Sequence, residues 1–160
     1  MLFRSNKFNL LFKNVTTESD NSNEYSNNFR SQNFGSILYD ISYPLKKEGN
    51  NFDSFISGKA SLMYSPNKNK NIKNLDRKIG IKNIFNQNRL GLSDSVEGGQ
   101  SLTLGGEFKL TDKSNNSFLT AGLASVLRDK NEEKLPISST INNKSSDIIG
   151  SFNIKPNNNF

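Results

Sequence analysis

The side chains that could do chemistry in this sequence are carboxylates, hydroxyls and amines, because the chain has no Cys and no His. Their absence excludes disulfide bonds, a thiol nucleophile, an imidazole base and the commonest zinc ligand. A catalytic site would have to combine Asp, Glu, Ser, Lys or Tyr, and no paired spacing of these residues indicates one. We therefore expect no enzyme active site, no metal and no cofactor.

The composition is polar for a domain with a conventional core. Hydrophobic residues make up 32% of the chain, against roughly 45–50% in a typical soluble domain. Low hydrophobicity with a net charge of +6 is compatible with disorder, but the apolar residues cluster with a period of two. The basic charge is spread along the chain and mixed with Asp and Glu, so we expect no nucleic-acid partner, whereas an anionic lipid surface fits.

The clearest pattern is a strict alternation of apolar and polar residues over positions 101–110. A strand places successive side chains on opposite faces, so this segment has one apolar and one polar face. The apolar face carries Leu102, Leu104, Phe108 and Leu110. The polar face carries Ser101, Thr103, Glu107 and Lys109.

The same period of two recurs along the rest of the chain. The segments are 36–45, in which Leu38 is an exception, then 54–64, 118–127, 148–155 and a weaker one around 8–12. Short polar separators at 46–51 and 112–116 predict hairpin turns. The longer spacers 65–82 and 128–146 predict long loops, and unequal connections of this kind are typical of outer-membrane barrels.

Strands with one apolar face fit either a soluble sandwich or a membrane barrel. The clearest segments run about ten residues, which matches the roughly 9–11 needed to cross a bilayer and exceeds the five or six typical of strands in soluble proteins. Tyr39, Tyr43 and Tyr64 lie on apolar faces, two of them near segment ends, where interface aromatics gather. We expect an all-β, antiparallel, up-and-down sheet that forms part of an outer-membrane β-barrel, with the soluble sandwich as alternative.

Several motifs follow one another in the order known from one family. The first runs Ile84-Phe85-Asn86-Gln87-Asn88-Arg89, then Gly91 to Asp94, then Val96-Glu97-Gly98-Gly99. Residues 144–156 add a Ser-Asp-Ile-Ile-Gly strand opening, and residues 41–45 a Tyr-Pro strand end. This order resembles the C-terminal β-barrel domain of LptD, the lipopolysaccharide-assembly protein of the outer membrane. Residues 75–78 depart from the family, because they are mixed in charge where an acidic cluster is usual.

The resemblance implies that residues 1–160 are part of an LptD-like barrel domain, without the family's signal peptide, periplasmic domain and barrel C-terminus. It implies a translocon of the bacterial outer membrane that inserts lipopolysaccharide into the outer leaflet and makes or breaks no bond. The implied partners are lipopolysaccharide, an LptE-like lipoprotein that plugs the lumen, and the periplasmic bridge protein of the transport system. A passive channel or a receptor barrel is the alternative.

The family-motif positions are open to a structural and a functional interpretation. They are Asn88, Arg89, Glu97, Gly98, Gly99 and Asp147. The Asn-Arg pair would either lie at a loop base or contact lipid or a partner protein. The Glu-Gly-Gly run would begin a strand, with Gly allowing a close approach or a bulge, and Asp147 would cap a turn or point into the lumen. The resemblance also implies that Ser101, Thr103, Glu107 and Lys109 line a wet lumen.

Overall fold

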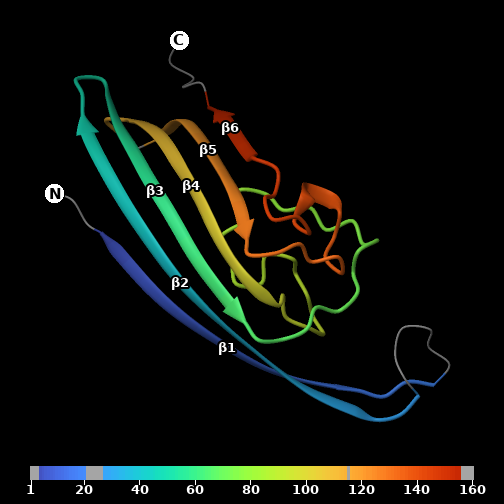
Figure 1. The fold of residues 1–160 in the computed structure, drawn as a ribbon. Coiled ribbons are helices and arrows are strands. Elements are labelled where there is room, and N and C mark those ends of the chain that lie inside the picture. Colours follow the sequence, from blue (N-terminus) through green and yellow to red (C-terminus); the bar gives the residue numbers. More distant parts are fainter. Residues whose placement is uncertain (1–3, 21–26, 115, 156–160) are drawn as a thin grey trace.

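Six antiparallel strands form one sheet in the computed structural model, which describes residues 4–20, 27–114 and 116–155 (Figure 1). They are β1 (Ser5–Thr17), β2 (Arg30–Glu48), β3 (Phe52–Ser65), β4 (Gly99–Asp112), β5 (Ser117–Arg128) and β6 (Ile149–Ile154). Each strand pairs with the next one along the chain, and the described helix is one short 3-10 turn, η1 (Ser138–Thr140). The all-β, up-and-down prediction is confirmed. Over the described residues the single sheet is not closed, and it excludes the alternative of two packed sheets.

Most strands extend beyond the alternating segment that predicted them. Residues 46–48, expected in a turn, continue β2 and pair with β3, so that only 49–51 form the turn. Lys46 supports this end of the hairpin, with its Nζ 2.8 Å from Glu48 Oε1 and 3.2 Å from Asp53 Oδ2. The backbone ladder needs no alternation of side chains, so hydrogen bonding carries the strand through polar residues.

The apolar positions align across the sheet on one face. One row across five strands consists of Phe8, Tyr39, Leu62, Leu102 and Leu127. Several large apolar residues on this face are more than half exposed, namely Leu10, Phe12, Leu62, Leu123 and Phe152. A contiguous apolar surface of this kind marks contact with lipid or protein rather than with water.

The two long connections, residues 66–98 and 129–148, fold back over the opposite face of the sheet, on its concave side (Figure 1). A small hydrophobic core lies between them and the sheet. Its buried members are Ile72, Ile79, Ile84, Leu90, Leu92, Ala124, Val126, Leu135 and Ile141. Only Ala124 and Val126 come from a strand. The core of this chain is therefore built mainly from isolated apolar residues of the Asn- and Lys-rich spacers.

The loops over this face explain why Leu38 is an exception to the alternation in β2. It lies on the loop-covered face in register with Met63 of β3, and both side chains are buried. Phe34, at an equivalent position of β2, is buried as well. Phe34, Leu38 and Met63 on the otherwise polar face thus lie in the part of the sheet that is buried.

The connections sort by length to the two ends of the sheet. Residues 49–51 and the turn after β4 lie at one end, and the long connections after β3 and β5 lie at the other (Figure 1). The prediction of unequal connections is confirmed. No helix in the described ranges is long and apolar enough to cross a membrane.

Candidate functional site

Two successive turns in residues 80–92 aim the Asn-Arg motif at the sheet. In the first turn Gly80 N donates to Asn83 Oδ1 at 2.8 Å, and Ile84 N donates to Gly80 O at 3.0 Å. In the second, Leu92 N donates to Asn88 Oδ1 at 2.8 Å. Asn side chains commonly bond their own backbone in this way. Asn88 therefore shapes the loop, and its turn holds the Arg89 side chain toward the face of β4.

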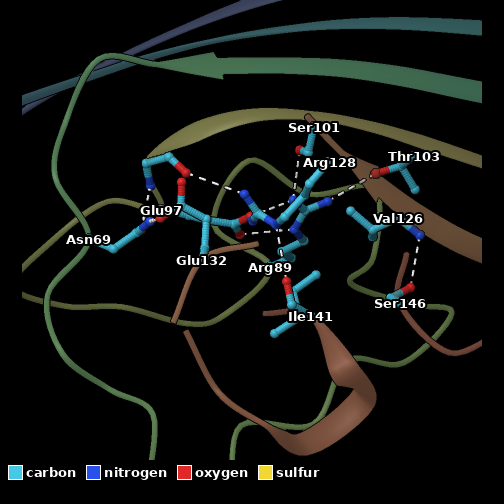
Figure 2. A network of polar contacts seen from close by, with 11 residues as sticks. Asn69, Arg89, Glu97, Ser101, Thr103, Val126, Arg128, Glu132, Ile141 and Ser146 are labelled. Carbon is cyan, nitrogen blue, oxygen red and sulfur yellow. Dashed lines mark hydrogen bonds and ion pairs between the residues drawn. The ribbon is translucent and has the colours of Figure 1, made fainter. Parts of the chain in front are cut away.

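The Glu-Gly-Gly run is the close-packed entry into β4. A Cβ at Gly98 would lie 2.0 Å from the carbonyl oxygen of Asn67, so no side chain fits there. Gly99, the first residue of β4, has φ of +91°, a conformation that favours glycine. The backbone packs closely at this run, and Glu97 points beneath the loops (Figure 2).

Arg89 and Glu97 form a buried ion pair over the first residues of β4 (Figure 2). Arg89 Nε donates to Glu97 Oε2 at 2.9 Å, and Arg89 Nη2 donates to Glu97 Oε1. The same guanidinium donates to Ser101 Oγ at 2.8 Å and to Thr103 Oγ1 at 2.9 Å. Two family-motif residues and two residues of the polar strand face therefore meet in one network.

Arg128, the last residue of β5, joins this network from the other side. Its Nη2 donates to Glu97 Oε1, its Nε donates to Ile141 O at 3.1 Å, and its Nη1 donates to Gly98 O at 3.4 Å. No motif in the sequence singles out Arg128. A usable signal was present, because Arg128 continues the face of β5 on which Ala124 and Val126 are buried.

The two loops are also joined directly to each other. Asn69 Nδ2 donates to Glu132 Oε2 at 2.9 Å, while Asn69 Oδ1 accepts from Gly98 N at 2.7 Å (Figure 2). Ile72 N donates to the carbonyl oxygen of Lys134 at 2.9 Å. On the second loop, Val126 N of β5 donates to Ser146 Oγ at 2.9 Å. The network thus holds both loops and the ends of two strands as one unit.

Burial sets the electrostatics of this network. The side chains of Arg89 and Glu97 are each 2% exposed, and that of Arg128 is fully buried. Burial lowers the pKa of Arg89 to about 10, because a low-dielectric surrounding disfavours the charged guanidinium. At neutral pH Arg89 stays protonated, so the Glu97 carboxylate has two cationic partners.

The Glu97 carboxylate has no oxygen left without a hydrogen bond, so the network has a structural role. Both oxygens of Glu97 accept from guanidinium N–H groups, which leaves the carboxylate unsuited to act as a base. Buried pairs of this kind add little net stability but enforce one geometry, since loss of a partner leaves a buried charge. Within the described residues, no group of His, Cys, Asp or Glu side chains is placed to hold a metal ion. The arrangement anchors the loops.

The remaining predicted residues lie apart from the network. Asp147 is exposed and belongs to the turn after η1, where Thr140 Oγ1 donates to Asp147 Oδ1 at 2.9 Å and accepts from Asp147 N at 2.7 Å. Glu107 Oε2 lies 2.7 Å from Lys59 Nζ. Lys109 is on the same face of β4, in register with Phe55 and Thr120.

Ser101 and Thr103 were expected to face a wet lumen, and their burial corrects this expectation. Ser101 and Thr103 do lie on the face opposite the exposed leucines, but each is 2% exposed beneath the loops. They accept hydrogen bonds from Arg89 and do not contact open water in this structure. Glu107 and Lys109, further along β4, are only partly buried. The two pairs of predicted lumen residues therefore have different surroundings.

Together these features define a class of protein. A meander of antiparallel strands, one exposed apolar face and long loops gathered at one end make up the wall of an up-and-down β-barrel. The chain belongs to the LptD family, because the family model described as LPS transport system D matches residues 5–160. The family places the chain in lipopolysaccharide transport. No curated protein and no solved structure matched the chain significantly.

Proposed function

We propose that this chain forms part of the barrel wall of an outer-membrane translocon that inserts lipopolysaccharide into the outer leaflet. The wall would correspond to the C-terminal barrel domain of the family. The exposed apolar face would contact lipid, and the face under the loops would line the lumen. Long loops lie outside the cell in such barrels and short turns in the periplasm, so the anchored loops would narrow the outer end of the lumen.

The observation that carries this proposal is the match to the LptD family over residues 5–160, on a sheet whose apolar side chains remain exposed across all six strands. Strands of 12 to 14 residues, as in β3, β4 and β5, exceed the roughly 9–11 needed to cross a bilayer. The partners proposed with this function are lipopolysaccharide, an LptE-like lipoprotein in the lumen and the periplasmic bridge protein.

Depletion of the protein in its own cell tests the proposed function. Newly made lipopolysaccharide, pulse-labelled after depletion, should fail to reach the outer leaflet, as measured by a modifying enzyme added outside the cells. The cells should also become sensitive to large hydrophobic antibiotics. If surface delivery of labelled lipopolysaccharide continues at the normal rate while uptake of small solutes falls, the protein is a passive channel and the proposal is wrong.

A further inference from the structure

A cavity of about 260 Å³ lies on the loop-covered face of the sheet. Its position follows from the cross-strand register, in which Glu107 of β4, Gly122 of β5 and Ser151 of β6 stand side by side in one row. Gly122 has no side chain, so the row has a gap between a carboxylate and a hydroxyl. The cavity occupies this gap.

One wall of the cavity is the edge of the anchored loop. Ile81 lies close to the strands, since a Cβ at Gly122 would be 3.2 Å from its Cγ1. Phe85 packs over Gly105, where a Cβ would lie 2.9 Å from the ring. Phe85 and Arg89 belong to the same pair of turns, so the ion-pair network also fixes this wall.

The polar groups of the cavity carry a net positive charge. Lys59 Nζ lies 2.7 Å from Glu107 Oε2 and 6.0 Å from the centre of the Phe85 ring. Lys82, which is exposed, adds a second ammonium group. The hydroxyls of Thr120 and Ser151 complete the lining. The cavity therefore offers two cations, one carboxylate, two hydroxyls and one aromatic ring.

We propose that this cavity binds a phosphorylated sugar residue, and this inference rests on the function proposed above. The hydroxyls and Glu107 would bond the sugar hydroxyls, the ring of Phe85 would contact the apolar face of the sugar, and the two lysines would hold the phosphate. Lysine is a common phosphate ligand as a point charge. The volume is below the 300–1,000 Å³ of ordinary ligand pockets, so the site takes a single sugar ring.

Other ligand classes fit the cavity less well. An acyl chain would remove the two ammonium groups and the carboxylate from water without replacing their hydrogen bonds, which is costly. A neutral sugar would satisfy the hydroxyls and Glu107 but give Lys82 no anion to bind. A phosphate alone would leave the aromatic wall and the hydroxyls unused. A sugar that carries a phosphate uses all of these groups at once.

Calorimetric titration of the detergent-solubilised protein, purified from its own membranes with its bound partners, tests this site. The probes are the core oligosaccharide released from lipopolysaccharide by mild acid, the same oligosaccharide after removal of its phosphates, and inorganic phosphate. Lys59→Gln and Lys82→Gln are the test variants. Lys78→Gln is the control, because it removes the same charge from an exposed position of the same loop. Folding of each variant is checked by resistance to heat in detergent gels.

The wild-type protein and Lys78→Gln should bind the phosphorylated oligosaccharide about tenfold more tightly than the dephosphorylated one, and each test variant should lose about tenfold. Equal binding by the folded test variants overturns the proposed cavity and leaves the proposed function standing. Full displacement by an equal concentration of inorganic phosphate also overturns it, in favour of a simple phosphate site. If depletion leaves the delivery of lipopolysaccharide to the outer leaflet unchanged, the proposed function itself is wrong.

Discussion

At the scale of single residues, Glu97 holds the loop anchor together. Glu97→Gln would leave the guanidinium group of Arg89 buried without an anionic partner, and it would remove the carboxylate that Arg128 contacts. Breaking a buried ion pair in this way costs about 3–5 kcal/mol. We expect both loops to detach, which limited trypsin digestion of whole cells would detect as rapid cleavage within residues 66–98 and 129–148.

The matched control for this change is Glu133→Gln, which makes the same substitution at an exposed position of the second loop. It should digest at the wild-type rate. If Glu97→Gln also resists trypsin like the wild-type protein, the ion-pair network does not anchor the loops.

The motifs in the sequence indicated Arg89 and Glu97, but they did not indicate Arg128 or the contacts among these three residues. Arg89 and Glu97 stood out because of their motifs, eight residues apart. Arg128 is 31 residues from Glu97 along the chain. Its place on the face of β5 that carries Ala124 and Val126 indicates burial but does not identify the residue that it contacts. A contact between distant residues depends on how the loops fold, and spacing in the sequence carries no information about that.

At the scale of elements, the core between loops and sheet rests on the first long loop. Ile84 is fully buried in it, and Ile84→Ala should cost about 2–5 kcal/mol, since a buried cavity would remain. We expect amide hydrogen exchange in residues 66–98 to accelerate while β1 to β3 stay protected. Ile137→Ala, at a position that is 54% exposed, should change neither the stability nor the rate of amide hydrogen exchange. Equal acceleration in the strands would mean that sheet and loops unfold as one unit.

We predict that the two faces of the strands differ in how well they tolerate an introduced charge. Leu104 lies near the middle of β4 on the exposed face, and Leu104→Arg should cost roughly 2–4 kcal/mol if that face meets the middle of a bilayer. Ser57→Arg places the same charge on the opposite face, across from Glu107, where water and the carboxylate can accommodate it. The fraction of heat-resistant folded barrel in membranes should fall for Leu104→Arg only.

Equal fractions of folded barrel for both variants would contradict the assignment of faces. Thr103, the direct neighbour of Leu104, is unsuitable as the control. Alternation alone suggests that a charge is tolerated there, but its side chain is buried and accepts a hydrogen bond from Arg89.

Alternation predicted every strand, because a two-residue period is what a sheet with unlike faces requires. It did not predict the strand ends, since backbone pairing continues through residues such as Lys47, which has polar residues on both sides and Ser54 opposite it. It also did not predict the loop core. Ile72 and Ile141 each have polar residues on both sides, and a single apolar residue has no period from which burial can be inferred.

At the scale of the whole molecule, the two faces of the sheet differ in character. One face is apolar and exposed along the strands, whereas the other is covered by anchored loops near one end and carries partly exposed charged groups further along. A chain with this division is not suited to water on both sides. The division fits a barrel wall with lipid outside and a polar lumen inside.

Cysteine labelling at two positions of β4, one on each face of the sheet, tests most directly whether the apolar face meets lipid and the opposite face meets water. The chain has no native Cys. Leu104 is exposed on the apolar face, and Glu107 is partly exposed on the opposite face. In outer membranes containing the intact protein, Leu104→Cys should react with a lipid-soluble maleimide and resist a water-soluble one. Glu107→Cys should show the opposite preference. Reaction of Leu104→Cys with the water-soluble reagent, or a reversed pattern, would contradict the assignment of the apolar face to lipid.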